Sequence, residues 1–138
     1  MTDTDTPDET ETEGEPTSTT ISGGFETTID GMDVTETVDV TVIDVDGDGM
    51  PDMMVTTTTD AIDVDGDGVP DIVQITEMVE IDLDGDGVPD LVDVTETVAI
   101  DVEGDGMFTI IEQTEVTAVD VDGDGSIDEI EVTTTELD

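Results

Sequence analysis

The chain has 138 residues, of which 42 are Asp or Glu; it contains no Lys, Arg or His, and its formal net charge is −42. Without cationic side chains it can neither meet the phosphates of nucleic acid nor offset its own repulsion with internal salt bridges, so compaction needs external cations. Cys and Trp are absent and there are only two Phe, which excludes a disulfide framework and a bulky aromatic core. No apolar run approaches the ~20 residues of a membrane span, so membrane insertion is not expected.

Residues 1–20 are rich in Thr, Asp and Glu and contain no apolar residue after Met1. Such a segment cannot offset the entropy of ordering, and its composition predicts a disordered acidic tail. It also lacks the basic and apolar regions of a secretory signal. An extracellular location would therefore need another export route or a signal outside this chain.

Residues 21–43 are predicted to form an entry β-hairpin. Two runs of strand-forming residues, Phe25 to Ile29 and Asp33 to Ile43, flank the dipeptide Asp30-Gly31. An Asp-Gly pair between two such runs is a strong hairpin signal. The segment has no acidic loop and is interpreted as a cap for the units that follow.

Residues 44–138 consist of five units of 19 residues, each opening with an acidic nine-residue loop. The loops read DVDGDGMPD, DVDGDGVPD, DLDGDGVPD, DVEGDGMFT and DVDGDGSID. Each loop is followed by about ten Thr- and Val-rich residues with apolar side chains at alternate positions, a period of two that predicts half-buried strands. The predicted strands are Val34–Ile43, Met53–Ile62, Ile72–Ile81, Leu91–Ile100, Ile110–Val119 and Glu129–Leu137.

The sequence therefore predicts an all-β fold, for which two architectures are compatible with the repeat. In an antiparallel meander each loop is a hairpin turn, and the loops alternate between the two ends of the sheet. In a parallel β-solenoid each unit is one coil, and all loops stack on one side. Stacked coils would place equivalent acidic loops only ~4.8 Å apart, whereas alternation roughly doubles that spacing. Electrostatic repulsion therefore favours the meander.

The loop pattern D-x-D-x-D-G-x-x-D supplies carboxylates at positions 1, 3, 5 and 9 and a carbonyl at position 7. Calcium takes six to eight hard oxygen ligands from similar alternating positions in EF-hand loops, with Gly at position 6 for the sharp turn. Magnesium demands a tighter octahedral geometry, and softer metals prefer the His or Cys that this chain lacks. The pattern predicts four to five Ca²⁺ ions.

The predicted ligands are the residues at positions 1, 3, 5, 7 and 9 of each loop. They are Asp44, Asp46, Asp48, Met50 and Asp52; Asp63, Asp65, Asp67, Val69 and Asp71; Asp82, Asp84, Asp86, Val88 and Asp90; Asp101, Glu103, Asp105 and Met107; and Asp120, Asp122, Asp124, Ser126 and Asp128. The fourth loop departs from the pattern, with Glu103 at position 3 and Thr109 at position 9. We expect it to be the weakest site, with Glu112 as a possible late ligand.

The loops Asp44–Asp52 and their four equivalents resemble the calcium-binding hairpin loops of FG-GAP/VCBS-type repeats, which occur in integrin-like propellers. They are also similar to thrombospondin type 3 repeats and to the first half of an EF-hand loop. The resemblance covers under half of the chain and implies calcium at the matching Asp residues. The FG-GAP/VCBS form implies a hairpin between antiparallel strands. Propeller repeats are several times longer than 19 residues, and EF-hands need flanking helices, so neither fold is carried over.

Two side-chain rows recur between the loops. The Thr row comprises Thr57, Thr76, Thr95, Thr114 and Thr133. It is interpreted as a solvated β-face, with an ordered-water or ice-binding surface as the sharper alternative. The Glu row comprises Glu77, Glu96 and Glu115, which are expected to lie side by side.

No enzyme is predicted, because the chain has no His, Cys or Lys and no aromatic pocket lining. The first hypothesis is a calcium-rigidified structural repeat protein outside the cell, a stalk or a filament subunit that assembles through strand edges or calcium-mediated contacts. The second is a calcium-dependent ice- or crystal-surface binder that uses the Thr face. The third is a soluble calcium buffer. Extracellular calcium concentrations match the weaker class of such loops, which favours the first hypothesis.

Overall fold

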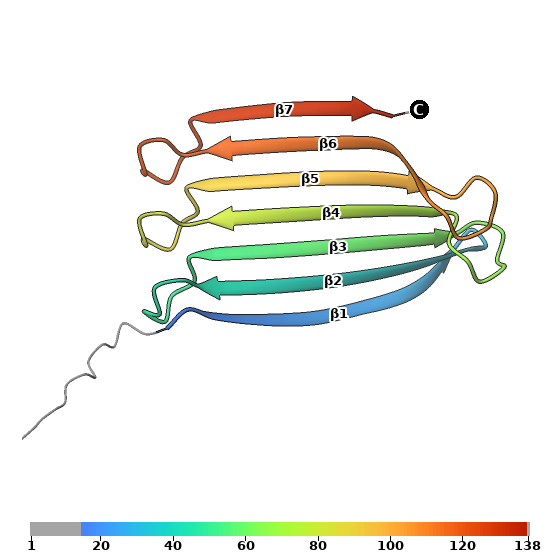
Figure 1. Ribbon diagram of the computed structural model, residues 1–138, viewed down its shortest axis with the longest axis horizontal. Helices are drawn as coiled ribbons and strands as arrows, with labels where there is room; N and C mark the ends of the chain where they lie inside the picture. Colours follow the sequence, from blue (N-terminus) through green and yellow to red (C-terminus); the bar gives the residue numbers. More distant parts are fainter. Residues whose placement is uncertain (1–14, 138) are drawn as a thin grey trace, which may run out of the picture.

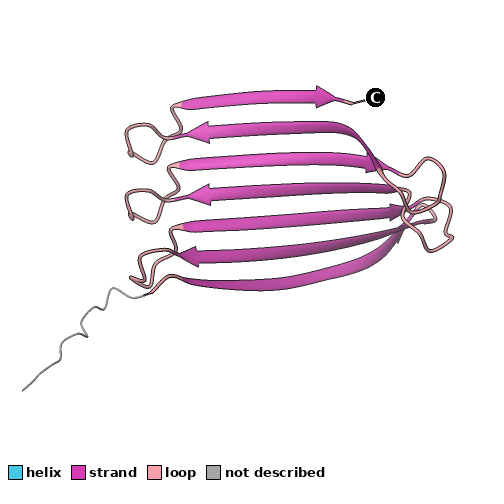
Figure 2. Cartoon of the chain, in the orientation of Figure 1, coloured by secondary structure: helices cyan, strands magenta, loops and turns pink. Residues whose placement is uncertain are grey.

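The computed structural model describes residues 15–137, and these form seven β-strands in one sheet without a helix (Figure 2). The strands are β1 (Thr17–Ile29), β2 (Met32–Asp44), β3 (Met53–Asp63), β4 (Ile72–Ile81), β5 (Leu91–Ile100), β6 (Thr109–Val119) and β7 (Glu129–Glu136). Within the described residues, no helix is long and apolar enough to cross a membrane.

The sheet is an open antiparallel meander in which each strand pairs with the next one along the chain (Figure 1). This arrangement confirms the predicted meander and excludes the solenoid, whose neighbouring strands would be parallel. The strands that follow the loops begin and end within about one residue of their predicted bounds, because alternating Val, Ile and Thr favour a pleated strand.

The strand β1 begins earlier than its composition suggests. Asp30 and Gly31 join β1 to β2 with φ angles of 52° and 87°, both positive as in a two-residue type I′ turn. The pairing continues from this turn back to Thr17, opposite Asp44. Residues 17–20 of the predicted tail therefore belong to β1, because β2 supplies backbone hydrogen-bond partners without any need to bury side chains. Residues 1–14 of that tail lie outside the described residues.

The sheet has no hydrophobic core. Among the described residues no apolar side chain is buried, and the four buried residues are Asp63, Asp90, Asp101 and Asp120. Each of these belongs to an acidic loop or to its first or last residue. Stable domains normally pack two layers around an apolar core. In this single layer, the backbone ladder and the loops must contribute what a core contributes elsewhere.

The Glu row does not form, and the expectation that its members lie side by side is wrong. Glu96 faces Thr76 on β4 and Thr114 on β6, whereas Glu77 and Glu115 both lie on the opposite face of the sheet. Facing residues in these ladders are both odd or both even in number, but equivalent residues of adjacent repeats differ by 19. Equivalent positions therefore alternate between faces, and this separates like charges that would repel if they were opposed.

The Thr row is divided in the same way. Thr57, Thr95 and Thr133 lie on one face, and Thr76 and Thr114 lie on the other. Within each face, Glu side chains occupy intervening strands at the same level. The register therefore interrupts a continuous Thr surface across neighbouring strands.

Candidate metal centres

The five acidic loops lie at the two ends of the sheet (Figure 1). We number them L1 to L5 in chain order, beginning at Asp44, Asp63, Asp82, Asp101 and Asp120. L1, L3 and L5 share one end, and L2 and L4 share the other with the β1–β2 turn. The alternation follows directly from the meander, because each loop reverses the chain.

Each loop is folded around the carboxylate of its first Asp. In L2, both oxygens of Asp63 accept backbone hydrogen bonds, Oδ1 from Gly66 N–H at 2.7 Å and Oδ2 from Gly68 N–H at 2.7 Å. Asp71 closes the loop, since its Oδ2 accepts from Val64 N–H at 2.7 Å. The first Asp of the other four loops accepts from the same two Gly positions.

The two Gly residues of each loop are required by its backbone. Gly66 and Gly68 have φ angles of 77° and 92°, and the equivalent glycines of the other loops lie between 69° and 91°. This left-handed region is costly for residues with a Cβ atom. The chain can therefore turn twice within five residues and bring both N–H groups to one carboxylate.

The carboxylates of four loops converge on one point. In L2, oxygens of Asp63, Asp65 and Asp71 lie within 4.8 Å of one another, and L5 groups its first, third and ninth positions in the same way. L1 and L3 group positions 1, 3 and 5. Two oxygens bound to one Ca²⁺ are at most about 5 Å apart, since each Ca–O distance is roughly 2.3–2.6 Å. These four groups of Asp residues can hold a metal ion.

The hydrogen bonds leave ligand oxygens available. Asp65 and Asp67 each accept one backbone N–H, from Asp67 and Val69, through Oδ1 alone. Asp71 accepts through Oδ2 alone. The second oxygen of each side chain is free of these bonds, so a cation can be bound without dismantling the loop. The predicted position-7 residues also lie in the loops, and their N–H groups donate to the position-5 Asp.

The pKa values of the loop carboxyls diverge with position. Burial opposes the ionisation of Asp63, but the N–H groups of Gly68 and Gly66 outweigh it and lower the pKa. For Asp65, the Asp67 N–H favours the charged form, yet burial and repulsion from the other carboxylates of the loop prevail and raise the pKa. Lowered pKa values recur at Asp44, Asp82, Asp101 and Asp120, and raised values recur at Asp46, Asp84 and Asp122. The repulsion at position 3 is what a bound cation would relieve.

L4 differs from the other loops at its exit. Thr109 stands where an Asp would accept the second residue's N–H, and β6 begins at Thr109 itself. The β5–β6 ladder compensates with a shift of register between Val98 and Ala99, a β-bulge that leaves Ile111 as the extra residue. Glu112 lies within β6, opposite Val98. Among the described residues, no group of three converging carboxylates includes a residue of L4 or Glu112.

Loops at the same end of the sheet are joined by backbone hydrogen bonds, a feature that the spacing did not predict. Asp82 N–H donates to the Asp52 carbonyl at 2.9 Å, which links L3 to L1. The same bond, at 2.8 Å, links Asp101 to Asp71 and Asp120 to Asp90. Each bond therefore joins a first-position residue to a ninth-position residue or carbonyl two loops earlier. Alternation between ends does not isolate the loops.

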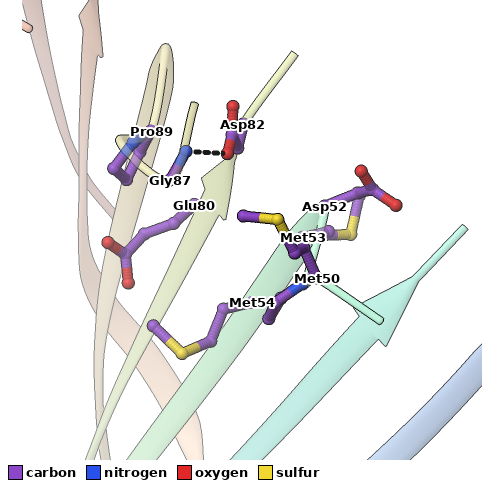
Figure 3. Close-up of a pocket in the computed structure, with 9 residues that line it drawn as sticks. Met50, Asp52, Met53, Met54, Glu80, Asp82, Gly87 and Pro89 are labelled. Atoms are coloured by element: carbon purple, nitrogen blue, oxygen red, sulfur yellow. Dashed lines mark hydrogen bonds between the residues drawn. The ribbon is translucent and has the colours of Figure 1, made fainter. Parts of the chain in front are cut away.

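L1 and L3 also line a shallow, largely apolar cavity of about 240 Å³ (Figure 3). Met50, Met53 and Met54 come from L1 and the start of β3, and Gly87 and Pro89 come from L3. The apolar residues of the loop exits thus lie beside the neighbouring loop, which adds a side-chain contact to the backbone link.

A comparison with known protein families, curated proteins and solved structures finds no match for this chain. The candidate function therefore depends on the geometry of the loops and on the charge of the chain.

Proposed function

We propose that this protein is a calcium-binding structural repeat protein, which becomes rigid when calcium occupies its loops. The observation that supports the proposal most strongly is the convergence of three Asp oxygens within 4.8 Å in each of four loops. Their hard oxygen donors suit Ca²⁺, and the chain contains no His or Cys for a softer metal.

The absence of a core gives calcium a structural role. No apolar side chain of the described residues is buried, and no cationic side chain balances the 42 acidic ones. A ligand that binds only the folded state stabilises it by about 2.7 kcal/mol per site when its concentration is 100 times Kd. Four occupied loops would thus supply roughly 11 kcal/mol, comparable to the total stability of an ordinary domain.

We propose an extracellular location and a role as a stalk or as a subunit of a surface filament. Extracellular calcium-binding modules have Kd values of about 10⁻⁴–10⁻³ M, which suits loops whose ligands come from one short segment. The open strands at both edges of the sheet offer backbone groups to a second copy. The role is not enzymatic, since the described cavity has no paired acid and base in distinct environments.

The two other hypotheses receive less support. A surface binder that uses the Thr face would need a continuous row, but Thr and Glu alternate across the strands. A calcium buffer needs charge rather than order, and it would not need loops joined to one another by backbone hydrogen bonds.

The proposal is tested by circular dichroism during a calcium titration that starts from chelated protein. We expect a coil-to-β transition that saturates at four to five ions, as counted by isothermal titration calorimetry. Magnesium at the same concentration is the control, and it should be much less effective because of its stricter geometry. A full β spectrum in chelator, unchanged by calcium, would contradict the proposal.

A further inference from the structure

The sheet ends in two unpaired strands, β1 and β7, which differ in their fitness for pairing with another chain. All 13 residues of β1 and all eight of β7 are exposed. Proteins usually protect such edges with Lys, Pro, bulges or short strands. The strand β1 has none of these features, because it is long, contains neither Lys nor Pro, and pairs with β2 without an irregularity.

Charge distinguishes the two edges. The strand β1 carries a single acidic residue, Glu26, in 13 positions. The strand β7 carries Glu129, Glu131 and Glu136 in eight positions. If two copies of β7 paired flush and antiparallel, Glu129 of each would face Glu136 of the other, and directly opposed like charges are destabilising. The outer edge of β1 is therefore the place where two copies of this acidic chain repel each other least.

Strand direction distinguishes the ways in which two copies can meet. The strands β1 and β7 run in the same direction (Figure 1). A copy added head to tail by translation would therefore pair β7 with β1 in parallel, which is slightly less stable per residue than the antiparallel pairing of the sheet. Two copies of β1 related by a two-fold axis pair antiparallel and continue the ladder.

We propose that the outer edge of β1 is a self-association site, at which β1 strands of two copies pair antiparallel across a two-fold axis at Gly23. A flush pairing uses all 13 residues and places Ile21 opposite Phe25 of the second copy. These side chains are 69% and 54% exposed in the single chain, and a β-branched residue facing an aromatic one is a favourable cross-strand pair. A Cβ atom added at Gly23 would meet nothing within 4 Å, so the axis position is sterically open.

The same register places Glu26 opposite Thr20 of the second copy. The two Glu26 side chains are then six residues apart along the strand, about 20 Å, which exceeds the Debye length at physiological salt. The contact closes at two copies, because a two-fold interface uses the same strand of each. It rests on the proposed function in one respect, namely that calcium must offset the charge of two chains of −42 before they meet.

The test is sedimentation velocity of the full chain, in chelator and in saturating calcium, with circular dichroism on the same samples. Thr20→Lys places a cation opposite Glu26 of the second copy, and Thr20→Glu places a like charge there. Both variants remove the hydrogen bond between Thr20 and Thr41, at 2.7 Å, so their difference isolates charge. Thr134 is the matched control, since it lies on the other edge strand and accepts a hydrogen bond from Thr114 at 3.3 Å.

We expect a calcium-dependent dimer, which Thr20→Lys tightens and Thr20→Glu weakens by roughly 2- to 30-fold each, from two opposed pairs per dimer. The Lys and Glu variants of Thr134 should leave the dimer unchanged. A monomer with a full calcium-induced β spectrum would overturn the pairing but not the calcium scaffold. Open-ended oligomers that respond to Thr134 variants would overturn it in favour of head-to-tail assembly. A dimer sensitive to Thr20 in a chain whose spectrum ignores calcium would uphold the edge pairing and refute the proposed function.

Discussion

L2 and L4 lie at the same end of the sheet and share the same turn, but only L2 gathers three carboxylates. Both wrap their backbone around a buried first Asp, Asp63 or Asp101, with glycines at positive φ. The difference lies at the exit, where L2 has Asp71 and L4 has Thr109. The wrapping of the loop therefore depends on its first Asp and its glycines, whereas the gathering of ligands depends on its ninth residue. The following predictions break or sharpen this contrast.

The largest effect is expected from Asp71→Thr, which gives L2 the exit of L4. The substitution removes a predicted ligand and the acceptor for Val64 N–H. Loss of groups that merely support metal ligands costs 10- to 100-fold in affinity, so loss of a ligand should cost L2 at least ~100-fold. Calorimetry should count one ion fewer, and the Gly66 amide resonance should no longer respond to calcium.

The control for this variant is Asp39→Thr, which removes the same charge from β2 and should leave the stoichiometry unchanged. If Asp71→Thr bound as many ions as the parent chain with equal affinity, the ninth position would not be a ligand.

The reverse change repairs L4. Glu103→Asp with Thr109→Asp restores the pattern of L2 and should raise the affinity of L4 by roughly 10- to 100-fold. The Gly104 amide should then respond to calcium at the concentration that saturates L2. Glu103→Asp with Thr97→Asp adds the same charge within β5 and is the control. An unaltered response of Gly104 in the repaired loop would show that the bulge at Ile111, rather than the missing carboxylate, prevents binding.

The repeat spacing and the period of two were sufficient to predict the strands after each loop and the end of each strand. They were sufficient because each of these strands is determined locally, by β-branched residues between Gly-rich loops. The grouping of Asp63, Asp65 and Asp71 also follows from spacing within nine residues. These parts of the fold require no knowledge of which strands are neighbours.

The features that the sequence did not predict all depend on the ladder. The pairing of residues 17–20 comes from β2 and not from their own composition. The separation of Glu96 from Glu77 follows from combining an odd repeat with a reversed strand. The bond from Asp101 N–H to the Asp71 carbonyl joins residues 30 positions apart and exists only because L2 and L4 share an end. Non-local geometry of this kind leaves no mark on a repeat pattern.

A smaller effect is expected from Gly66→Ala, which tests the backbone that L2 and L4 have in common. Gly66 has a φ of +77° and open space around it, so the variant isolates conformational strain from steric overlap. A left-handed residue with a Cβ atom costs about 1–2 kcal/mol. The midpoint of chemical unfolding in saturating calcium should fall accordingly. Gly104→Ala should cost the same amount in L4, whose φ is +69°.

Gly23→Ala is the matched control, because Gly23 also has open space but no positive φ. Ala is preferred to Gly within a strand by roughly 0.5–1 kcal/mol, so this variant should be neutral or stabilising. Equal destabilisation by Gly66→Ala and Gly23→Ala would remove the argument from φ.

The smallest effect is the dependence on pH, and it too separates the two loops. Because the pKa of Asp65 is raised in the folded chain, the metal-free fold takes up a proton more readily than the unfolded chain does. Its stability should therefore increase as the pH falls from 7 through the raised pKa toward the ordinary value of about 3.9. Below that value the gain should reverse, since the lowered pKa of Asp63 contributes stability that is lost on further acidification.

Calcium binding should follow the opposite trend, because protons compete with the metal for Asp65. The calcium concentration at half-saturation should rise a few-fold, about 2- to 5-fold, between pH 7 and pH 5. Asp71 is one of the carboxylates whose repulsion raises the pKa of Asp65. Asp71→Thr should thus reduce the pH-dependent stabilisation of the metal-free chain, measured by thermal unfolding in chelator at both pH values. An identical pH dependence in the parent chain and in this variant would mean that the ninth carboxylate does not set the charge state of the site, and the contrast between L2 and L4 would then be steric alone.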